Sequence, residues 1–592
     1  MNFKLRLLAL LLLVMVVFTS CSLESIMQYI PFLGGDVEQT TTTTTTEATT
    51  TTTPTSTTIK PTTTSTTKKP TVEVPEFDVS SSQTSKSELE ARYTLTQEEI
   101  DAVLAVLDEM VAVSLTAETS EEVDALYEEF ETAYYHIAQQ RTIAMIVYYY
   151  DMSNETASQR YLDTVDMFMA VQDKYNTSLK TMYQESPIAD QIFEGWSEEE
   201  LKALEEYDPA VLELQKEVDE LQVQYDQLSQ DDPDYDNKCV EIYKQLIVKN
   251  NQLARMNGYE NYYDYASVNV YGRDYEKEEL AKFRDYIVQY VVPSYESVLA
   301  DFNEYQNWTS KTNLSRLIEF INDPFYTSAK RNYLVMYLDS LEGTMGEGMR
   351  DVFESKNCLF SFSGNSHPTA FQTYLYEDDT PFCFFGSSGQ SASTVAHEIG
   401  HYYAAYTNSD IDNYDLCETH SQGNEFLFLT FCKDYLKEDV YNVARAYQLV
   451  NACYVMIMAT IIDEFEQNVY ALDDETIASM TGADFDAIMT QVCAPYGGAP
   501  WVESVVSNPY SYWRLVCISN PVYYISYAVS ASAAVGILAL AEADYDLALE
   551  SYTKLVEGIT PEDGFLGALA KAGLTTPFEE ETFINIGEIL AK

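Results

Sequence analysis

The chain has 592 residues, 46% of them hydrophobic, and a formal net charge of −60 because 94 acidic residues outnumber 34 basic ones. This length allows a very large domain or two lobes around a cleft, and so negative a surface excludes nucleic acid and anionic lipid headgroups as partners. The nine cysteines show no CxxC spacing, and most have apolar neighbours. Buried thiols are therefore predicted at least as readily as disulfides.

The first 20 residues have the layout of an export signal. Lys4 and Arg6 precede an apolar run, residues 7–18, that is too short to span a membrane. Small residues then stand directly before Cys21, which resembles a bacterial lipobox, where the cysteine carries a lipid; the alternative is an ordinary signal peptide with an incidental cysteine. We expect residues 1–20 to be a lipoprotein signal peptide and Cys21 to anchor the protein on the extracytoplasmic face of a bacterial cell membrane.

The next segment, residues 21–90, is predicted to be a disordered stalk. Between residues 39 and 71 the sequence is almost entirely Thr with scattered Pro and Lys, which leaves too little apolar surface to build a core. At about 3 Å per residue, such a chain could hold the following domain roughly 200 Å from the membrane.

From about residue 91 to residue 592 the composition is globular, and apolar residues recur at helical spacing. Asp208 and Pro209 are residue types expected at a helix start, and apolar residues follow at intervals of three and four up to Leu228. A second series ends just before Gly258, which predicts an antiparallel helical hairpin. The fold class predicted for this part is mainly α.

One segment departs from the helical pattern. The stretches CLFSFSG (358–364), TAFQTYLYEDDTP (369–381) and FCFFGSSG (382–389) alternate aromatic with small or polar residues and are separated by turn signals. They predict a small β-sheet of two or three short strands. An extended peptide can bind along the edge of such a sheet through its own backbone hydrogen bonds.

The stretch TVAHEIGHYYAAY (394–406) follows directly and contains an HExxH motif. On a helix, His397 and His401 lie on one face and can bind a single ion, while Glu398 lies about 100° around the helix, beside the ion rather than on it. Two structural histidines would not require this glutamate, so the motif predicts one zinc ion per chain. A metzincin would have a third histidine six residues after His401, but Thr407 occupies that position.

A catalytic zinc ion takes three protein ligands and keeps one position open, so one ligand is still needed. The stretch DLCETHSQGNEFLFL (415–429) is helical in pattern, and Glu418 and Glu425 share a face that can meet the HExxH helix. Glu418 is the predicted third ligand. Glu425 competes with it but could instead orient a ligating histidine from behind, and His420 lies about 200° around the helix from Glu418, which favours a structural role.

The pattern HEIGH followed by CETHSQGNEFL is similar to the HExGH and ExxS motifs of the thimet oligopeptidase and oligoendopeptidase F family of zinc peptidases. Further segments resemble this family in the same order along nearly all of the globular part: LARMNGYENYYDYA, RDYIVQYVVPSY, the strand segment 367–401 and NPVYYISYAVSASAA. The resemblance implies a helical body with two lobes, one formed mainly by residues 91–350 and a zinc-containing catalytic lobe formed by residues 351–592. It also implies a deep channel that admits short unfolded peptides, and we expect a monomer.

The resemblance also implies roles for individual residues. The family's ExxS glutamate is the third zinc ligand, which carries over to Glu418. The strand segment implies peptide contacts for three residues: Ala370, Phe371 and Gly386. The tyrosine segment implies that Tyr523 and Tyr527 are catalytic hydrogen-bond donors. It implies that Tyr524 binds substrate.

The sequence departs from the family in one respect. Members usually have a histidine shortly before the tyrosines, whereas this chain has none after His420. Tyr512, Arg514 or a shifted tyrosine could substitute for it, or the enzyme could be slower or differently selective. The predicted function is a zinc-dependent endopeptidase in which the ion activates water and Glu398 is the general base. Two alternatives are a carboxypeptidase or dipeptidyl carboxypeptidase on the same scaffold, and a peptide-binding lipoprotein with impaired catalysis.

Overall fold

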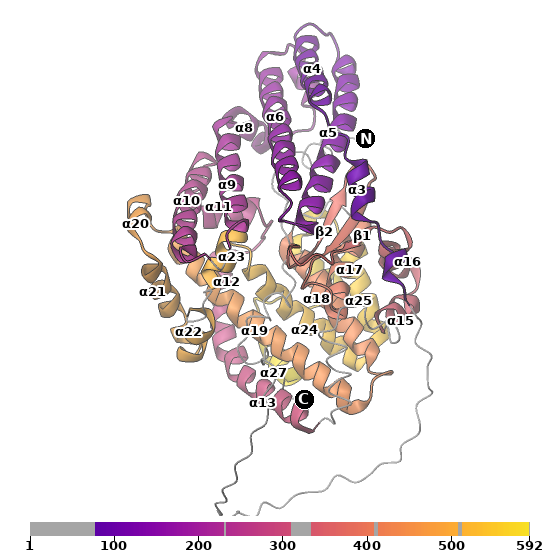
Figure 1. The fold of residues 1–592 in the computed structure, drawn as a ribbon, viewed down its shortest axis with the longest axis vertical. Helices are drawn as coiled ribbons and strands as arrows, with labels where there is room; N and C mark the ends of the chain where they lie inside the picture. The colour runs from indigo at the N-terminus through magenta and orange to yellow at the C-terminus, as the bar shows by residue number, and fades with distance from the viewer. Residues whose placement is uncertain (1–76, 230–231, 309–332, 408–412, 507–511, 591–592) are drawn as a thin grey trace, which may run out of the picture.

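The computed structural model describes residues 77–229, 232–308, 333–407, 413–506 and 512–590. Figure 1 shows a mainly helical molecule with one small sheet, which is the fold class predicted from the sequence. The signal peptide, Cys21 and most of the stalk lie outside the described residues, so their predicted properties stay predictions.

The fold begins earlier in the chain than residue 91, the boundary expected from composition. It includes the short helix η1 (Val79–Ser81) and α3 (Lys86–Arg92). The ring of Phe77 packs against Phe353 with centroids 4.9 Å apart, and the backbone N–H of Thr84 donates to the carbonyl of Cys358 at 3.0 Å. These contacts join residues far apart in the sequence, which is why local composition did not reveal them.

A first group of helices packs around its own hydrophobic core. Its members are α4 (Gln97–Ser114), α5 (Glu121–Tyr150), α6 (Glu155–Glu185), α7 (Ala189–Ile192) and α8 (Glu198–Glu206). Helix α4 begins with a capping box, in which the Thr96 side chain accepts from the Glu99 N–H and the Glu99 carboxylate accepts from the Thr96 N–H. Aromatic side chains of α5 and α6 fill the core, with the rings of Phe130 and Tyr175 stacked 4.7 Å apart.

The predicted strands form one sheet in the described part of the chain, in the order β1 (Cys358–Phe360), β3 (Thr380–Phe385), β2 (Ala370–Leu375). Strand β1 is parallel to β3, and β2 is antiparallel to it. The side chains of β3 alternate between two hydrophobic cores. Phe382 and Phe384 face the core of the first helix group, whereas Cys383 and Phe385 face a second, larger core, called the main core below. Strand β3 is therefore buried on both faces.

The predicted helical hairpin is present. Helix α9 (Ala210–Asp226) begins directly after Pro209, and α10 (Tyr235–Met256) ends two residues before Gly258, which has a φ of 84°. The ion pair between Lys249 and Glu217 joins the middle parts of the two helices. The chain then continues through α11 (Tyr262–Asn269), α12 (Lys277–Tyr286), the π-helix η2 (Ile287–Val291), α13 (Val292–Trp308), α15 (Tyr333–Ser340) and α16 (Gly343–Glu354).

The remaining helices enclose the main core. They are α17 (Ala392–Thr407), α18 (Tyr414–Cys432), α19 (Glu438–Tyr470), α20 (Asp474–Ser479), α21 (Gly482–Val492), η3 (Ala494–Tyr496), α22 (Ala499–Val505), α23 (Tyr512–Ser519), α24 (Ile525–Ala543), α25 (Tyr545–Glu557), η4 (Pro561–Asp563), α26 (Gly564–Ala572) and α27 (Glu580–Leu590). The core of the first helix group also includes strand side chains up to Phe384, and the lobe boundary expected at residue 350 stays a prediction.

Helices α19 and α24 are long and apolar enough to cross a membrane, judged by length and composition alone. The most apolar window is 100% buried in α19 and 78% buried in α24, so both are core helices of this fold. Several cysteines also belong to the interior: in the described part of the chain, buried free thiols are found at Cys239, Cys358, Cys383, Cys432, Cys453, Cys493 and Cys517.

Candidate metal centre

Helix α17 carries the HExxH residues in the interior of the fold. It packs against the sheet and α18 (Figure 1), and residues 393 to 404 are all buried. The imidazole rings of His397 and His401 lie on one face with centroids 5.0 Å apart, as their spacing predicted. Glu398, the residue after His397, is fully buried.

Gly400, inside the motif, is a point of close contact between α17 and α18. A Cβ atom at this position would lie 2.7 Å from the carbonyl oxygen of His420 and 2.8 Å from the Cα atom of Ser421. Backbone of α18 therefore occupies the space that any other side chain would need. The His420 ring turns to another partner, with Nε2 3.1 Å from the carbonyl oxygen of Leu555.

Three potential ligand atoms converge between α17 and α18: His397 Nε2, His401 Nε2 and Glu418 Oε2. The Glu418 oxygen is 3.4 Å from His397 Nε2 and 3.7 Å from His401 Nε2. Both Nε2 atoms are buried and have no hydrogen-bond partner among the described residues. Ligand atoms around a tetrahedral zinc ion lie roughly 3.3 to 3.6 Å apart, so the arrangement fits a shared metal ion.

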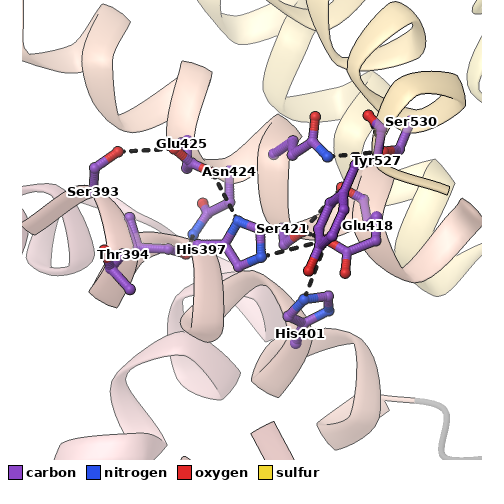
Figure 2. A network of polar contacts seen from close by, with 12 residues as sticks. Ser393, Thr394, His397, His401, Glu418, Ser421, Asn424, Glu425, Tyr527 and Ser530 are labelled. Atoms are coloured by element: carbon purple, nitrogen blue, oxygen red, sulfur yellow. Dashed lines mark hydrogen bonds and ion pairs between the residues drawn. The ribbon is translucent and has the colours of Figure 1, made fainter. Parts of the chain in front are cut away.

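Glu425 supports this group from behind. Its Oε1 lies 2.7 Å from His397 Nδ1, and Figure 2 shows Glu425 and Glu418 on opposite sides of the His397 ring. Because a carboxylate only accepts hydrogen bonds, Nδ1 carries a proton, and loss of the second proton from Nε2 is what would let His397 bind a metal ion. Two residues that the sequence analysis did not identify extend the chain of contacts: Ser393 donates to Glu425 at 2.8 Å, and Gln448 donates to Ser393 at 2.8 Å.

The electrostatics of the centre favour a cation. Burial opposes charge on His397, but its interactions with the Glu418 and Glu425 carboxylates raise its pKa well above the usual range, so the metal-free centre favours a protonated His397. Burial lowers the pKa of His401 to about 3, against the opposing charge of Glu418. Burial also opposes ionisation of Glu418, yet its interactions with the two histidines hold its pKa below the usual range. An ionised carboxylate beside a neutral His401 is the ligand state that a metal requires.

Tyr523 reaches the same centre from a distant part of the chain. It lies in the turn before α24, and its hydroxyl donates to Glu418 Oε1. The ring of Tyr527 is almost perpendicular to that of Tyr523, with centroids 5.2 Å apart, and Figure 2 shows Tyr527 beside Glu418. Tyr524 is buried next to them, 5.5 Å from the Tyr527 ring. The structure thus brings the predicted tyrosine segment to the predicted ligands.

The candidate substitutes for the family's histidine have contacts elsewhere. The hydroxyls of Tyr512 and Tyr454 are 2.9 Å apart. Arg514 pairs with Asp486 at 3.0 Å and lies over the Trp513 ring, 4.2 Å from its centroid. None of these partners belongs to α17 or α18, so these contacts do not support Tyr512 or Arg514 as donors at the metal centre.

The three residues expected to contact substrate from the strand segment are buried. Phe371 packs against Phe384 and Tyr149 at centroid distances of 5.1 and 5.8 Å, so its side chain is part of a core. Ala370 is fully buried on the other face of β2. At Gly386, a Cβ atom would lie 2.0 Å from the carbonyl oxygen of His367. A peptide contact by these residues stays a prediction, and it would have to involve their backbone.

Fold and donor set together define a helical protein with a buried His-His-Glu group that fits a metal site. Solved structures with a similar fold include PZ peptidase A with an inhibitor, at a TM-score of 0.65 and 19% identity over 86% of this chain and 99% of that one. Two proteins described as oligoendopeptidase F are also similar. One has a TM-score of 0.63 and 18% identity over 84% of this chain and 97% of its own. The other, from Bacillus anthracis, has a TM-score of 0.61 and 18% identity over 83% and 95%.

No protein-family model and no curated protein sequence matches the chain. The structural similarity confirms the predicted resemblance to oligoendopeptidase F at the level of the fold. These three proteins with a similar fold are peptidases by name.

Proposed function

We propose that the chain is a zinc metallopeptidase that cleaves short unfolded peptides at internal bonds. The observation that carries this proposal is the convergence of two imidazoles and one carboxylate, from His397, His401 and Glu418, beside the buried Glu398. Such a donor set suits Zn²⁺ and leaves a fourth position open, as in catalytic rather than structural sites. The shared fold with PZ peptidase A and oligoendopeptidase F supports the proposal.

Each residue of the centre has its own task in this reaction. A bound zinc ion would polarise the scissile carbonyl and make water more acidic. Glu398 accepts a proton from the attacking water and returns it to the leaving amine. Glu425 fixes the orientation and tautomer of His397. The hydroxyl of Tyr523, which donates to Glu418 in this structure, would turn to the carbonyl oxygen on which negative charge develops.

The sheet supports peptides as substrates. Among the described strands, β2 pairs only with β3, and the backbone of an extended peptide that bound along its second edge would continue the sheet. Helix α17, which carries two of the predicted metal ligands, packs against both strands, so a peptide bound along β2 would lie near the predicted centre.

We also propose that the enzyme acts outside the cytoplasmic membrane. The lipobox-like residues before Cys21 and the Thr-rich stalk support a lipid-anchored form. Cys21→Ala should release the protein from washed membranes into the soluble fraction. An uncleaved chain found soluble in the cytoplasm would contradict this location.

Mass spectrometry of the products from a mixed peptide library, with and without a metal chelator, tests the activity. Internal cleavage that the chelator abolishes and zinc restores is the expected result. Peptides with an amidated C-terminus separate the alternatives, because a carboxypeptidase requires a free C-terminus and an endopeptidase does not. Zinc-loaded protein that binds peptides but leaves all of them intact would refute the proposal and favour a binding lipoprotein.

A further inference from the structure

The turn that carries Tyr523 has an unusual backbone conformation. Residues Asn520 to Tyr523 form a β-turn closed by a hydrogen bond of 3.3 Å from the Tyr523 N–H to the Asn520 carbonyl. Pro521 occupies the second position of the turn and Val522 the third, with a φ of 65°. A positive φ at the third position is the signature of a type II turn, which favours glycine there. A β-branched residue in this region is strained.

Val522 differs from the other described non-glycine residues that have a positive φ. Those residues, Lys356 and Asp379, are exposed, whereas Val522 is 1% exposed. Because strain of this kind persists only where surrounding contacts impose it, the neighbours of Val522 should reveal what holds the turn.

Two side chains hold the central peptide group of the turn. The hydroxyl of Tyr271 donates to the carbonyl oxygen of Pro521 at 2.6 Å. The N–H of Val522 donates to Oε1 of Glu466, on α19, at 2.8 Å. The carbonyl and the N–H of one trans peptide point in opposite directions, so the two contacts bind opposite sides of the central peptide. This is the peptide group whose orientation differs between type I and type II turns. Neither contact could form after a flip.

A third side chain ties the turn to the helix of the metal ligand. Arg273 Nη2 donates to the carbonyl oxygens of Val522 at 2.7 Å and of Tyr523 at 3.3 Å. The same guanidinium group lies 3.8 Å from Asp415 on α18, measured from Arg273 Nε to Asp415 Oδ1. Asp415 precedes Glu418 by three residues, so Arg273 links the start of α18 to the backbone of the residue whose hydroxyl meets Glu418.

We infer that Tyr271, Arg273 and Glu466 are positioning residues that hold the strained turn and thereby direct the Tyr523 hydroxyl to the metal centre. None of them contacts the ligand atoms directly in the interactions described above. The catalytic consequence of this inference depends on the proposed peptidase activity, whereas the conformational part does not.

The inference predicts a coupling between Tyr271 and Val522. Tyr271→Phe keeps the ring but removes one hydrogen bond to the turn, and should lower kcat about five-fold with KM changed less than two-fold. Val522→Gly makes the type II turn intrinsically favourable, so in that background Tyr271→Phe should change kcat less than two-fold. Unequal effects in the two backgrounds would show that both residues act on the same turn.

Tyr134→Phe is the matched control, because the Tyr134 hydroxyl also makes one buried hydrogen bond, of 2.7 Å to Gln172, in the other hydrophobic core. This variant should lower the unfolding midpoint and leave kcat within two-fold of the wild type. An equal loss of kcat in Tyr134→Phe would mean that general destabilisation explains the effect of Tyr271→Phe, and the inference would be wrong. The same conclusion follows if Tyr271→Phe leaves kcat unchanged.

Glu466 provides a second test. Burial raises the pKa of Glu466 well above its usual range, so Gln, which keeps an acceptor oxygen, is a close mimic of the neutral side chain. Glu466→Gln should keep kcat within two-fold, whereas Glu466→Met, which has no such acceptor, should lose about as much as Tyr271→Phe. Equal kcat values for the Gln and Met variants would contradict the role of the acceptor.

A readout without catalysis separates this inference from the proposed function. The free energy of unfolding of the metal-free protein is measured for Tyr271→Phe, Val522→Gly and the double variant. The inference predicts non-additive effects, with a smaller loss from Tyr271→Phe when Gly is present. Additive effects refute it even if the wild type proves to be an active peptidase, and non-additive effects support it even if no peptide is cleaved.

Discussion

Replacing Gly400 by alanine should disrupt the metal centre through a single methyl group. The added Cβ would lie 2.7 Å from the His420 carbonyl oxygen and 2.8 Å from the Ser421 Cα atom. Both are backbone atoms of α18, so no side chain can rotate away. To reach the ordinary contact distance of 3.4 Å, α17 and α18 would have to separate by about 0.7 Å.

This separation acts directly on the ligand set, because two ligands are on α17 and Glu418 is on α18. Metal sites tolerate displacements of about 0.2 Å in ligand distance, so we expect Gly400→Ala to weaken zinc binding at least ten-fold. The effect on folding should be smaller. Alanine gains about 1 kcal/mol in helix propensity, and overpacking costs about 1 to 3 kcal/mol, which leaves a net loss of about 0 to 2 kcal/mol.

Competition with a chromogenic chelator measures the zinc affinity, and chemical denaturation of the metal-free protein measures stability. Gly536→Ala is the matched control, because Gly536 also lies inside a helix, α24, but a Cβ there would meet only Leu574 Cδ2 at 3.7 Å. The control should keep its zinc affinity and gain up to about 1 kcal/mol of stability. Zinc affinity of Gly400→Ala within two-fold of the wild type would refute the packing argument.

Three further outcomes follow from the structure. Glu398→Gln should keep one zinc ion per chain by elemental analysis while kcat falls about a hundred-fold or more, since the ligands are intact and the base is lost; near-normal turnover would exclude Glu398 as the base. Tyr523→Phe should lower kcat about a hundred-fold at saturating zinc, and a change in KM alone would instead indicate ground-state substrate contact. Burial raises the pKa of Asp226 from 3.8 to about 7, so the folded state binds the carboxyl proton more tightly than the unfolded state does. The stability that this protonated carboxyl contributes is lost as pH rises from about 4 to about 7. Between pH 5 and pH 8, Asp226→Asn should therefore lose less stability in denaturation than the wild type, and equal losses would contradict the raised pKa of this half-buried carboxyl.

The spacing of four residues between His397 and His401 shows what the local sequence determines, namely which side chains share one face of a helix. Helical periodicity places residues four apart on one face, so the motif could be placed on a helix, and its geometry predicted, without knowing any tertiary contact. The same kind of local signal predicted the strands and the hairpin of α9 and α10. Glu418 needed one further step, the pairing of two helix faces, and the family resemblance supplied the same answer.

What the tertiary structure alone decided are contacts between residues far apart in the chain. Spacing gives no information about which backbone a helix approaches, so the role of Gly400 became apparent only from the position of α18. For the same reason, composition assigned residues 77–90 to the stalk although Phe77 and Thr84 pack on the body of the protein. The strained turn before Tyr523 depends on side chains from two separate segments, at Tyr271 and at Glu466. A valine at a position that favours glycine is locally unfavourable, and only long-range hydrogen bonds, which no local pattern records, make that conformation the stable one.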